Sequence, residues 1–539
     1  MGNIKRVFTV DGQPYFIVGA QARNSSGYNE AESERAFRAL KAIHGNTLEV
    51  PVYWGQVEPS EGHFDFTSVD ALLTSARRNG VRLVLLWFGT WKNGDMDYVP
   101  DWVKTNPQRF RRVLSSTGKD IWNLSSYCRA SFEADKAAFT AFCRHLKERD
   151  GDAHTVIALQ VENESGILGC DRDYGPDGQT AFDSPVPADL VAKMRAASRG
   201  WVYEHWQKAG GREAGSWPEL FGWEAGELMT AWSIAGYIDR LVEAGKAIYD
   251  LPMYINVWLG SDRCNAAGEA YPSGGAVAHV LDIYKWYTPH IDLIAPDIYI
   301  ADTKGYEAAC ADYARDDNPL FVPESPQNGS NAWLMFSAVG NYDATGYSFF
   351  AAEDVLCDDG SVHPECRALV ESFQSLAAAV PLLLKYQGSG RIHAVVQEEF
   401  LAGQWLDLEG YTGQVEFDGA GGGAFRDWRH SAPAARDRVG NEPRRGRGLV
   451  IQAGPHEFYL VGSAFRLTLR PKLPPEQGRD LAVAVGWLPA RQAHYVSVDE
   501  GHFDERGAFV VDRQRNGDEF DFGLWVEADT GVVRAILCE

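Results

Sequence analysis

The stretch that most narrows the fold reads Gln160-Val161-Glu162-Asn163-Glu164-Ser165-Gly166. It closes an apolar segment, residues 155–159, that predicts a buried strand, and it places a glutamate at the end of that strand. A second run, Phe321-Val322-Pro323-Glu324-Ser325, has the same form. In a parallel α/β barrel the C-terminal strand ends share one face, and catalytic groups sit there. The two runs therefore predict that Glu164 and Glu324 lie on one face of a barrel.

Around these runs, strand-like and helix-like segments alternate from about residue 15 to 380. Asn29 is a predicted N-cap for the first helix and Thr67 for the second. Eight β/α units predict a (β/α)8 TIM barrel over residues 1–384, with a long insertion near 166–220. The predicted strands cover residues 15–20, 46–52, 81–88, 155–163, 253–258, 291–299, 319–324 and 346–350.

The pattern changes after about residue 385. Helical periodicity disappears, and short alternating segments separated by turn residues predict an antiparallel β-sandwich over residues 385–539. A Gly-rich stretch at 419–423 lacks the strand-to-helix context of a phosphate loop, so we expect a plain loop there. The predicted strands include 448–452, 457–461, 465–469, 509–511, 522–526 and 532–537.

Composition limits the possible partners. The formal net charge of −23 argues against nucleic acid or an anionic membrane as a partner. We find no apolar run long enough to span a bilayer, and the eight cysteines show no CxxC pair, so we expect reduced thiols and a cytoplasmic protein. The sequence holds neither a metal-binding pattern of histidines and cysteines nor a dinucleotide fingerprint, so we predict no metal and no cofactor.

Two opposed glutamates suit the cleavage of a glycosidic bond, which needs two carboxyl groups about the scissile oxygen. A separation of roughly 5–5.5 Å means retention through a covalent intermediate, and a larger gap means inversion. Strand ends that face each other across a barrel mouth can supply the shorter distance. The alternative is that both are ordinary ion-paired glutamates, but their matching positions favour the catalytic interpretation.

The run Gln160-Val161-Glu162-Asn163-Glu164 resembles the acid/base motif of glycoside hydrolase family 35, the β-galactosidases. The resemblance implies that Glu164 is the acid/base, Glu324 the nucleophile, and Asn163 the partner of the sugar 2-hydroxyl. The sequence departs from the common family pattern at Ser165, where a tyrosine is usual, and around Glu324. Similarity to a bacterial branch of the family extends over the β-rich tail and residues 50–54, 58–66, 85–93 and 295–299.

Further side chains that follow predicted barrel strands could line a sugar pocket. Tyr299 ends the sixth strand, and its phenol could hydrogen-bond Glu324 and keep it ionised, consistent with the pattern of the wider clan. Glu162 lies two residues before Glu164, so on a regular strand it points to the same side, and we expect it to hold neighbouring groups in place. The other candidates are Asn24, Trp54, Asn256, Trp258 and Glu353.

Together these features predict a retaining, exo-acting β-glycosidase, with a β-galactosidase favoured, that acts by double displacement on an oligosaccharide or glycoside. A homo-oligomer is left open. The alternatives are a β-glucosidase or β-glucosyltransferase on the same scaffold, and a non-catalytic carbohydrate-binding protein, which would not need both carboxyl groups. The insertion near 166–220 is expected either to form a wall of the sugar-binding cleft or to be a packing or subunit-contact segment. The side chains in it that could contact sugar are Asp171, Asp173, Tyr174 and Trp201.

Overall fold

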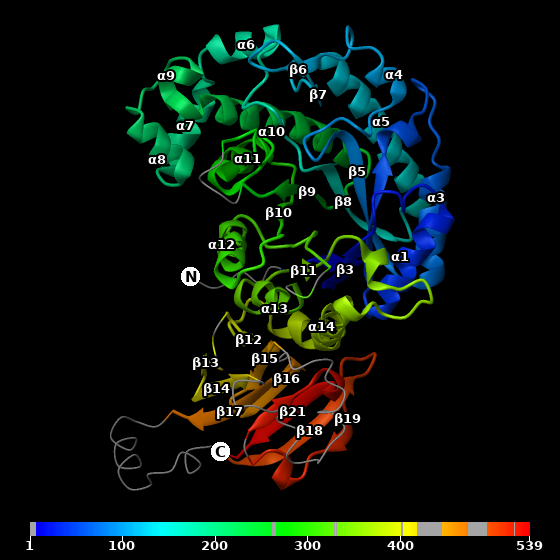
Figure 1. Ribbon diagram of the computed structural model, residues 1–539, viewed down its shortest axis with the longest axis vertical. Coiled ribbons are helices and arrows are strands. Elements are labelled where there is room, and N and C mark those ends of the chain that lie inside the picture. Colours follow the sequence, from blue (N-terminus) through cyan, green and yellow to red (C-terminus); the bar gives the residue numbers. More distant parts are fainter. Residues whose placement is uncertain are drawn as a thin grey trace.

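A curved sheet of parallel strands forms the centre of the larger part of the protein (Figure 1). The computed structural model describes residues 7–260, 266–327, 329, 331–399, 401, 403–417, 445–472, 493–521 and 523–538. Seven strands pair in the order β10-β9-β8-β5-β4-β3-β11. Their bounds are β3 (Ile17–Gln21), β4 (Thr47–Tyr53), β5 (Arg82–Lys92), β8 (Val156–Asn163), β9 (Met253–Trp258), β10 (Leu293–Asp297) and β11 (Gly346–Tyr347).

The sheet closes into a barrel through a short strand segment at residues 320–324. Within it, Val322 forms a parallel bridge with Tyr347 of β11, and Glu324 forms one with Asp297 of β10. Backbone hydrogen bonds of 2.8 and 2.9 Å accompany the two bridges. Because this segment joins both edges of the seven-stranded sheet, the predicted (β/α)8 TIM barrel is confirmed.

Among the described residues, one helix after each strand segment covers the outside of the barrel (Figure 1). At the first helix the Asn29 side chain accepts from the Glu32 N–H at 3.1 Å, as its predicted cap. The second begins at Thr67 itself, so that cap prediction is wrong; Asp65 accepts the Thr67 N–H at 2.9 Å. These helices are α1 (Glu30–Ala42), α3 (Thr67–Asn79), α5 (Arg129–Asp150), α10 (Ala225–Lys246), α11 (Leu281–Tyr287), α12 (Thr303–Tyr313), α13 (Asn331–Asn341) and α14 (Arg367–Tyr386).

Two segments extend the C-terminal side of the barrel. A hairpin of β6 (Arg112–Leu114) and β7 (Asp120–Leu124) follows β5. The long insertion lies between β8 and α10, and its first residues pair with the loop after β9 through a bridge between Ile167 and Ser273. It carries α6 (Pro176–Asp183), α7 (Ala188–Ala197), α8 (Trp201–Lys208) and α9 (Trp217–Phe221).

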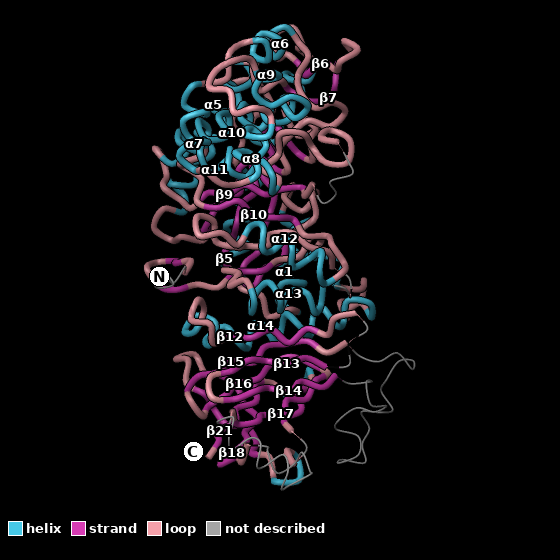
Figure 2. The backbone as a smooth tube through the Cα atoms, turned by 90° about the vertical axis from the view of Figure 1, so that its left-hand side faces the viewer, coloured by secondary structure: helices cyan, strands magenta, loops and turns pink. Residues whose placement is uncertain are grey.

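The C-terminal part is an antiparallel β-sandwich, as predicted (Figure 2). The Gly-rich stretch 419–423 lies outside the described residues. Strands β12, β13, β14 and β18 were not among the strands predicted from the sequence. One sheet comprises β12 (Ile392–Val396), β15 (Arg447–Gly454), β16 (Glu457–Ser463), β21 (Val532–Leu537), β18 (Tyr495–Phe503) and β19 (Phe509–Gln514), and the other β13 (Gly403–Leu408), β14 (Tyr411–Phe417), β17 (Phe465–Pro471) and β20 (Leu524–Val526).

The six-stranded sheet of the sandwich and the barrel share one hydrophobic core. Leu449 of this sheet and Phe373 of α14 belong to the same cluster of buried side chains. Arg447 of β15 is 3% exposed and donates to Ser372 Oγ at 2.7 Å and to Glu371 Oε2 at 2.8 Å. The sheet therefore packs directly on the last helix of the barrel, while the boundary at residue 384 stays a prediction.

In the part of the chain that the structure describes, one helical stretch, Pro364–Tyr386, is long and apolar enough to span a bilayer by length and composition. The expectation that no such segment exists is therefore corrected on those two criteria. Its packing offers another explanation: 44% of the apolar window is buried, and α14 lies between the barrel and the six-stranded sheet (Figure 2). A core helix passes the same test, so the evidence for a membrane span is weak.

Candidate active site

Three carboxyl groups meet at the C-terminal face of the barrel. Glu164 follows β8, Asp297 ends β10, and Glu324 ends the segment that closes the barrel. Their residues are 8%, 3% and 7% exposed, respectively. One oxygen from each lies within 4.8 Å of the other two. The structure thus brings the two predicted glutamates together and adds Asp297, which the sequence did not single out.

Glu324 is held by two neutral donors. The Tyr299 phenol donates to Oε1 at 2.6 Å, and the Gln21 side-chain amide donates to Oε2 at 3.1 Å. Burial, and then the nearby Glu324 charge, hold the pKa of Tyr299 well above its ordinary value, so the phenol keeps its proton. Donors on both oxygens hold the Glu324 carboxyl in a fixed orientation, as a nucleophile requires.

Glu164 has a different environment. Burial, followed by the charge of Glu324, raises the pKa of its carboxyl to about 7, while the Lys92 ammonium acts in the opposite direction. Its backbone N–H donates to Asn256 Oδ1 at 3.0 Å, which fixes the strand end. Two neighbouring carboxyl groups with such different surroundings can share the roles of proton donor and nucleophile.

Asn163 and Lys92 lie side by side at the ends of β8 and β5. Lys92 Nζ donates to Asn163 Oδ1 at 2.8 Å, and the buried Asn163 Nδ2 has no hydrogen-bond partner among the described residues. A buried amide donor without a partner is costly unless a ligand accepts its proton. This fits the 2-hydroxyl contact that the family resemblance implies for Asn163, although that role stays a prediction.

Glu162 does not point to the same side as Glu164. Its Oε2 accepts the Trp91 N–H at 2.7 Å, and its carboxyl lies close enough to Asp135 of α5, outside the barrel wall, for the Asp135 charge to act on it. The expected alternation fails because Glu162 and Glu164 both have left-handed backbones, with φ of 63° and 45°, where the pairing of β5 with β8 shifts register. Burial, and then Asp135, raise the pKa of Glu162 well above its ordinary value. Glu162 therefore supports the end of β8 from the outer side of the barrel and does not face the pocket.

Of the predicted pocket residues on β9, Asn256 supports the carboxyl cluster directly. Its Oδ1 accepts from Glu164 and its Nδ2 donates to Asp297 Oδ2 at 2.7 Å, so both ends of its amide are engaged. Trp258 is partly exposed at the end of β9 and packs against the main core cluster.

The remaining three candidates lie in different settings. Trp54 is 0% exposed, and its indole N–H donates to Glu58 Oε2 at 2.8 Å, so it is a core residue and its predicted place in the pocket is wrong. Glu353 accepts the Arg23 N–H at 3.0 Å and the Ser26 hydroxyl, so it anchors the loop after β3. Asn24 in that loop is partly buried, and its Oδ1 has no partner among the described residues.

Sequence reasoning missed three polar residues of the site, Gln21, Lys92 and Asp297. Each is the last residue of a barrel strand, and this position was the available signal. Deeper in the barrel, burial raises the pKa of Glu49 to about 8, and Tyr254 donates to its Oε2 at 2.9 Å. The barrel therefore carries one further buried carboxyl group beneath the site, and its raised pKa favours the protonated form at neutral pH.

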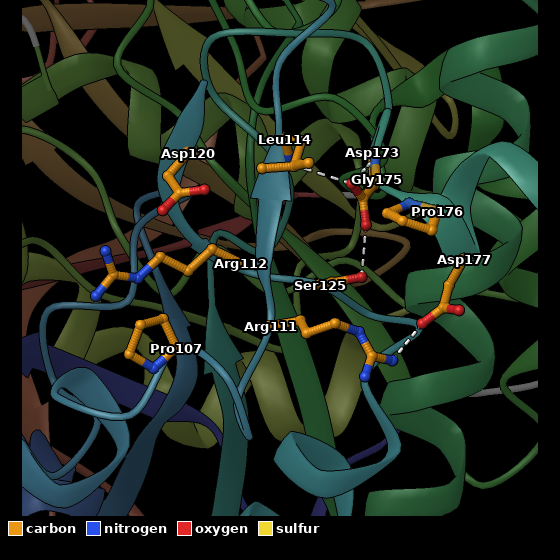
Figure 3. A pocket seen from close by; sticks show the side chains of 10 residues that line it. All are labelled: Pro107, Arg111, Arg112, Leu114, Asp120, Ser125, Asp173, Gly175, Pro176 and Asp177. Atoms are coloured by element: carbon orange, nitrogen blue, oxygen red, sulfur yellow. Dashed lines mark hydrogen bonds and ion pairs between the residues drawn. The ribbon is translucent and has the colours of Figure 1, made fainter. Parts of the chain in front are cut away.

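A separate hollow of about 200 Å³ lies between the β6–β7 hairpin and the insertion (Figure 3). Its polar walls are paired with one another: Asp173 accepts from the Leu114 N–H at 3.1 Å and from the Ser125 hydroxyl at 2.6 Å, and Arg111 pairs with Asp177. These bonds tie the insertion to the hairpin.

The insertion residues expected to contact sugar also bond within the protein. Tyr174 donates to Asp171 Oδ1 at 2.8 Å, and the Trp201 ring stacks on His205 with a centroid distance of 4.9 Å. Asp173 is engaged as described above. The packing role of this segment is thus directly visible, whereas its predicted role as a wall of the cleft stays a prediction.

Glu164, Asp297 and Glu324 are also close enough to hold a cation. The donor set argues against that use, because Gln21 and Tyr299 already occupy Glu324 and the Lys92 ammonium adds positive charge. A barrel with a buried carboxyl pair at its strand ends, one of which has a raised pKa, has instead the arrangement that retaining glycosidases use.

Two family models match parts of this chain. Residues 25–211 match the model of glycoside hydrolase family 42, described as Beta-galactosidase, and residues 369–527 match a Domain of unknown function (DUF5597). The first match indicates family 42 rather than family 35. The expected relation to family 35 is therefore corrected to the broader class of β-galactosidase-like glycoside hydrolases.

Curated relatives carry similar descriptions. Beta-galactosidase-1-like protein 3 of Homo sapiens is 30% identical over 181 residues, which cover 32% of this chain and 25% of that protein. Beta-galactosidase GalA of Bacillus licheniformis is 26% identical over 172 residues, covering 31% and 24%. The match thus spans about a quarter of the length of these relatives.

Solved structures resemble the fold at lower identity. The catalytic domain of a β-amylase from Paenibacillus polymyxa is 11% identical with a TM-score of 0.49, covering 67% of this chain and 98% of that one. A β-galactosidase from Rahnella sp. R3 is 15% identical with a TM-score of 0.49, covering 73% and 59%. The barrel assignment itself rests on the strand pairing described above.

Proposed function

We propose that this protein is a retaining, exo-acting β-galactosidase. The observation that supports this most is the pair formed by Glu164 and Glu324, whose nearest oxygens lie within 4.8 Å at the barrel mouth. That spacing suits direct attack by a carboxylate and leaves little room for the water that inversion needs. The names of the relatives favour galactose as the released sugar.

In the first step, Glu324 attacks the anomeric carbon while the protonated Glu164 donates its proton to the glycosidic oxygen. The bond between that carbon and oxygen breaks, the aglycone leaves as an alcohol, and a glycosyl ester forms on Glu324. Glu164 is now a carboxylate. Tyr299, whose phenol donates to Glu324 Oε1 at 2.6 Å, loses the ionised partner at this stage.

In the second step, Glu164 takes a proton from water, and the water oxygen attacks the anomeric carbon. The ester bond breaks, free sugar leaves with its original anomeric configuration, and Glu164 is protonated again. Esterification of Glu324 removes one cause of the raised pKa of Glu164, so the same group can act as a base here.

Sugar specificity is the finer part of this proposal, and a panel of chromogenic β-glycosides tests it. Release from β-galactosides far faster than from β-glucosides is expected; the reverse would favour the β-glucosidase alternative. No release from any glycoside would favour the non-catalytic carbohydrate-binding alternative. The cytoplasmic location and the homo-oligomer stay predictions, although the seven cysteines within the described residues are free thiols.

The roles of the two glutamates are tested by substitution. Glu324→Ala should abolish turnover and regain part of it with added azide, giving a glycosyl azide of inverted configuration. Glu148→Ala, at an exposed glutamate on α5, is the matched control and should retain activity. A rescued product with retained configuration would contradict the nucleophile assignment.

A further inference from the structure

Two hydrogen bonds link residues at the ends of three adjoining barrel strands beside the proposed acid/base. The Glu164 backbone N–H donates to Asn256 Oδ1 at 3.0 Å, and Asn256 Nδ2 donates to Asp297 Oδ2 at 2.7 Å. The carboxyl groups of Asp297 and Glu164 each place an oxygen within 4.8 Å of the other. All three residues are at least nine-tenths buried, so bulk water does not replace these contacts.

A hydrogen bond between these two neighbouring carboxyl groups needs a proton. Carboxylate oxygens only accept hydrogen bonds, so two carboxyl groups can bond only when one of them is protonated. Asp297 Oδ2 already accepts from Asn256, whereas Oδ1 is buried and has no conventional donor among the described residues. The proton of the contact therefore fits on Asp297 Oδ1, from which it can be donated to Glu164.

We propose that Asp297 is protonated in the free enzyme and acts as a positioning residue that donates a hydrogen bond to Glu164. The proposal rests on the proposed function, because it assigns a helper to the acid/base. One oxygen of Glu164 accepts the hydrogen bond from Asp297, which leaves the other oxygen, with its own proton, to face the glycosidic oxygen. When Glu164 loses its own proton to the leaving group, the bond from Asp297 becomes charge-assisted and stabilises the new carboxylate.

The surroundings of Asp297 support this assignment. Burial, and then the charges of Glu324 and Glu164, raise the pKa of Asp297 well above its ordinary value, while the Lys92 ammonium acts in the opposite direction. The other titratable groups that face it are the phenols of Tyr254, Tyr299 and Tyr313. Burial raises the pKa of each phenol, so none adds a charge near neutral pH.

Two substitutions separate a protonated Asp297 from an ionised one. Asparagine reproduces the protonated form, because its oxygen can accept from Asn256 and its NH2 can donate to Glu164. Asp297→Ala should lower kcat/KM by roughly tenfold to hundredfold, the effect of losing a charge-assisted hydrogen bond, and Asp297→Asn should restore most of that loss. The basic limb of the pH profile of kcat/KM should stay in place in Asp297→Asn and move upward in Asp297→Ala.

An ionised Asp297 predicts the opposite shift. Replacing a negative charge next to Glu164 by an amide would lower the basic limb of Asp297→Asn by a unit or more, and that result would overturn the proposal. Failure of Asp297→Asn to restore activity, with an unchanged melting temperature, would also overturn it. The thermal melt distinguishes a lost contact from a lost fold.

Infrared difference spectroscopy decides the protonation state without any turnover. With aspartate labelled with carbon-13 at its side-chain carboxyl, wild type minus Asp297→Asn should show a carboxylic-acid carbonyl band at pH 7. A carboxylate band in its place would refute the proposal even if the protein proved to have no glycosidase activity. Asp152→Asn, at an exposed aspartate, is the matched control and should remove only a carboxylate band.

Discussion

The ionisation of Glu164 should change within the catalytic cycle. In the free enzyme, burial and the charge of Glu324 raise the pKa of Glu164 to about 7. In the glycosyl-enzyme, Glu324 is a neutral ester and its contribution disappears. Two unit charges 4.8 Å apart at an effective dielectric constant of about 20 interact by about 3.5 kcal/mol, or roughly 2.5 pKa units; each carboxylate spreads its charge over both oxygens, which reduces the effect below that of the nearest pair. Since burial remains, we expect a fall of about one to two units.

Two pH profiles measure this fall. The basic limb of kcat/KM reports Glu164 in the free enzyme, where it must be protonated, so activity should decline above about pH 7. A 2-deoxy-2-fluoro-β-galactosyl fluoride traps the glycosyl-enzyme, and its reactivation needs ionised Glu164, so that rate should rise with pH through an apparent pKa of roughly 5–6. Coincident midpoints, or a higher midpoint in the trapped enzyme, would refute the electrostatic reasoning.

Three further substitutions test separate parts of the structure. Tyr299→Phe removes the phenol that donates to Glu324 and should lower kcat/KM roughly tenfold to hundredfold with no change in circular dichroism; a smaller effect would mean that this bond is not catalytically relevant. Arg447→Met removes the hydrogen-bond donor to Glu371 and Ser372 between α14 and the six-stranded sheet, and should lower the free energy of unfolding by about 2–4 kcal/mol in urea titrations. The control Arg367→Met, at an exposed arginine of α14, should leave that free energy unchanged. Trp54→Phe should lower the free energy of unfolding by about 1–3 kcal/mol and leave the sugar preference unchanged. A changed sugar preference would contradict the assignment of Trp54 to the core.

The sequence located the two glutamates because their positions depend on local features. Each follows a short apolar strand, and the barrel brings all C-terminal strand ends to one face. The direction of Glu162 could not be predicted, because it depends on left-handed backbone angles and a register shift between β5 and β8. Those features arise from tertiary pairing and break the period of two on which the sequence argument relied.

The sequence also could not predict which candidate residues are buried in the core or which residues from different strands contact one another. Trp54 follows β4 as a pocket residue would, but it belongs to the short helix α2 (Trp54–Val57) and turns into the core. Asp297 lies in a segment that the sequence had already marked as family-like, yet its proposed role depends on a bond from Asn256 and on the nearness of Glu164, which come from two other strands. Contacts between residues 41 and more positions apart leave no trace in local periodicity.

The packing of the six-stranded sheet on α14 determines which segment of the chain can be exchanged as a unit between proteins. The second family match begins at residue 369, inside α14 and before the predicted boundary at 384, so the segment shared with other proteins includes the last helix of the barrel. Recombination that exchanged only the strands would pair a foreign sheet with a resident helix and expose unmatched apolar surface. A graft of this tail onto another barrel should therefore carry α14 with it, because the heritable module begins at that helix.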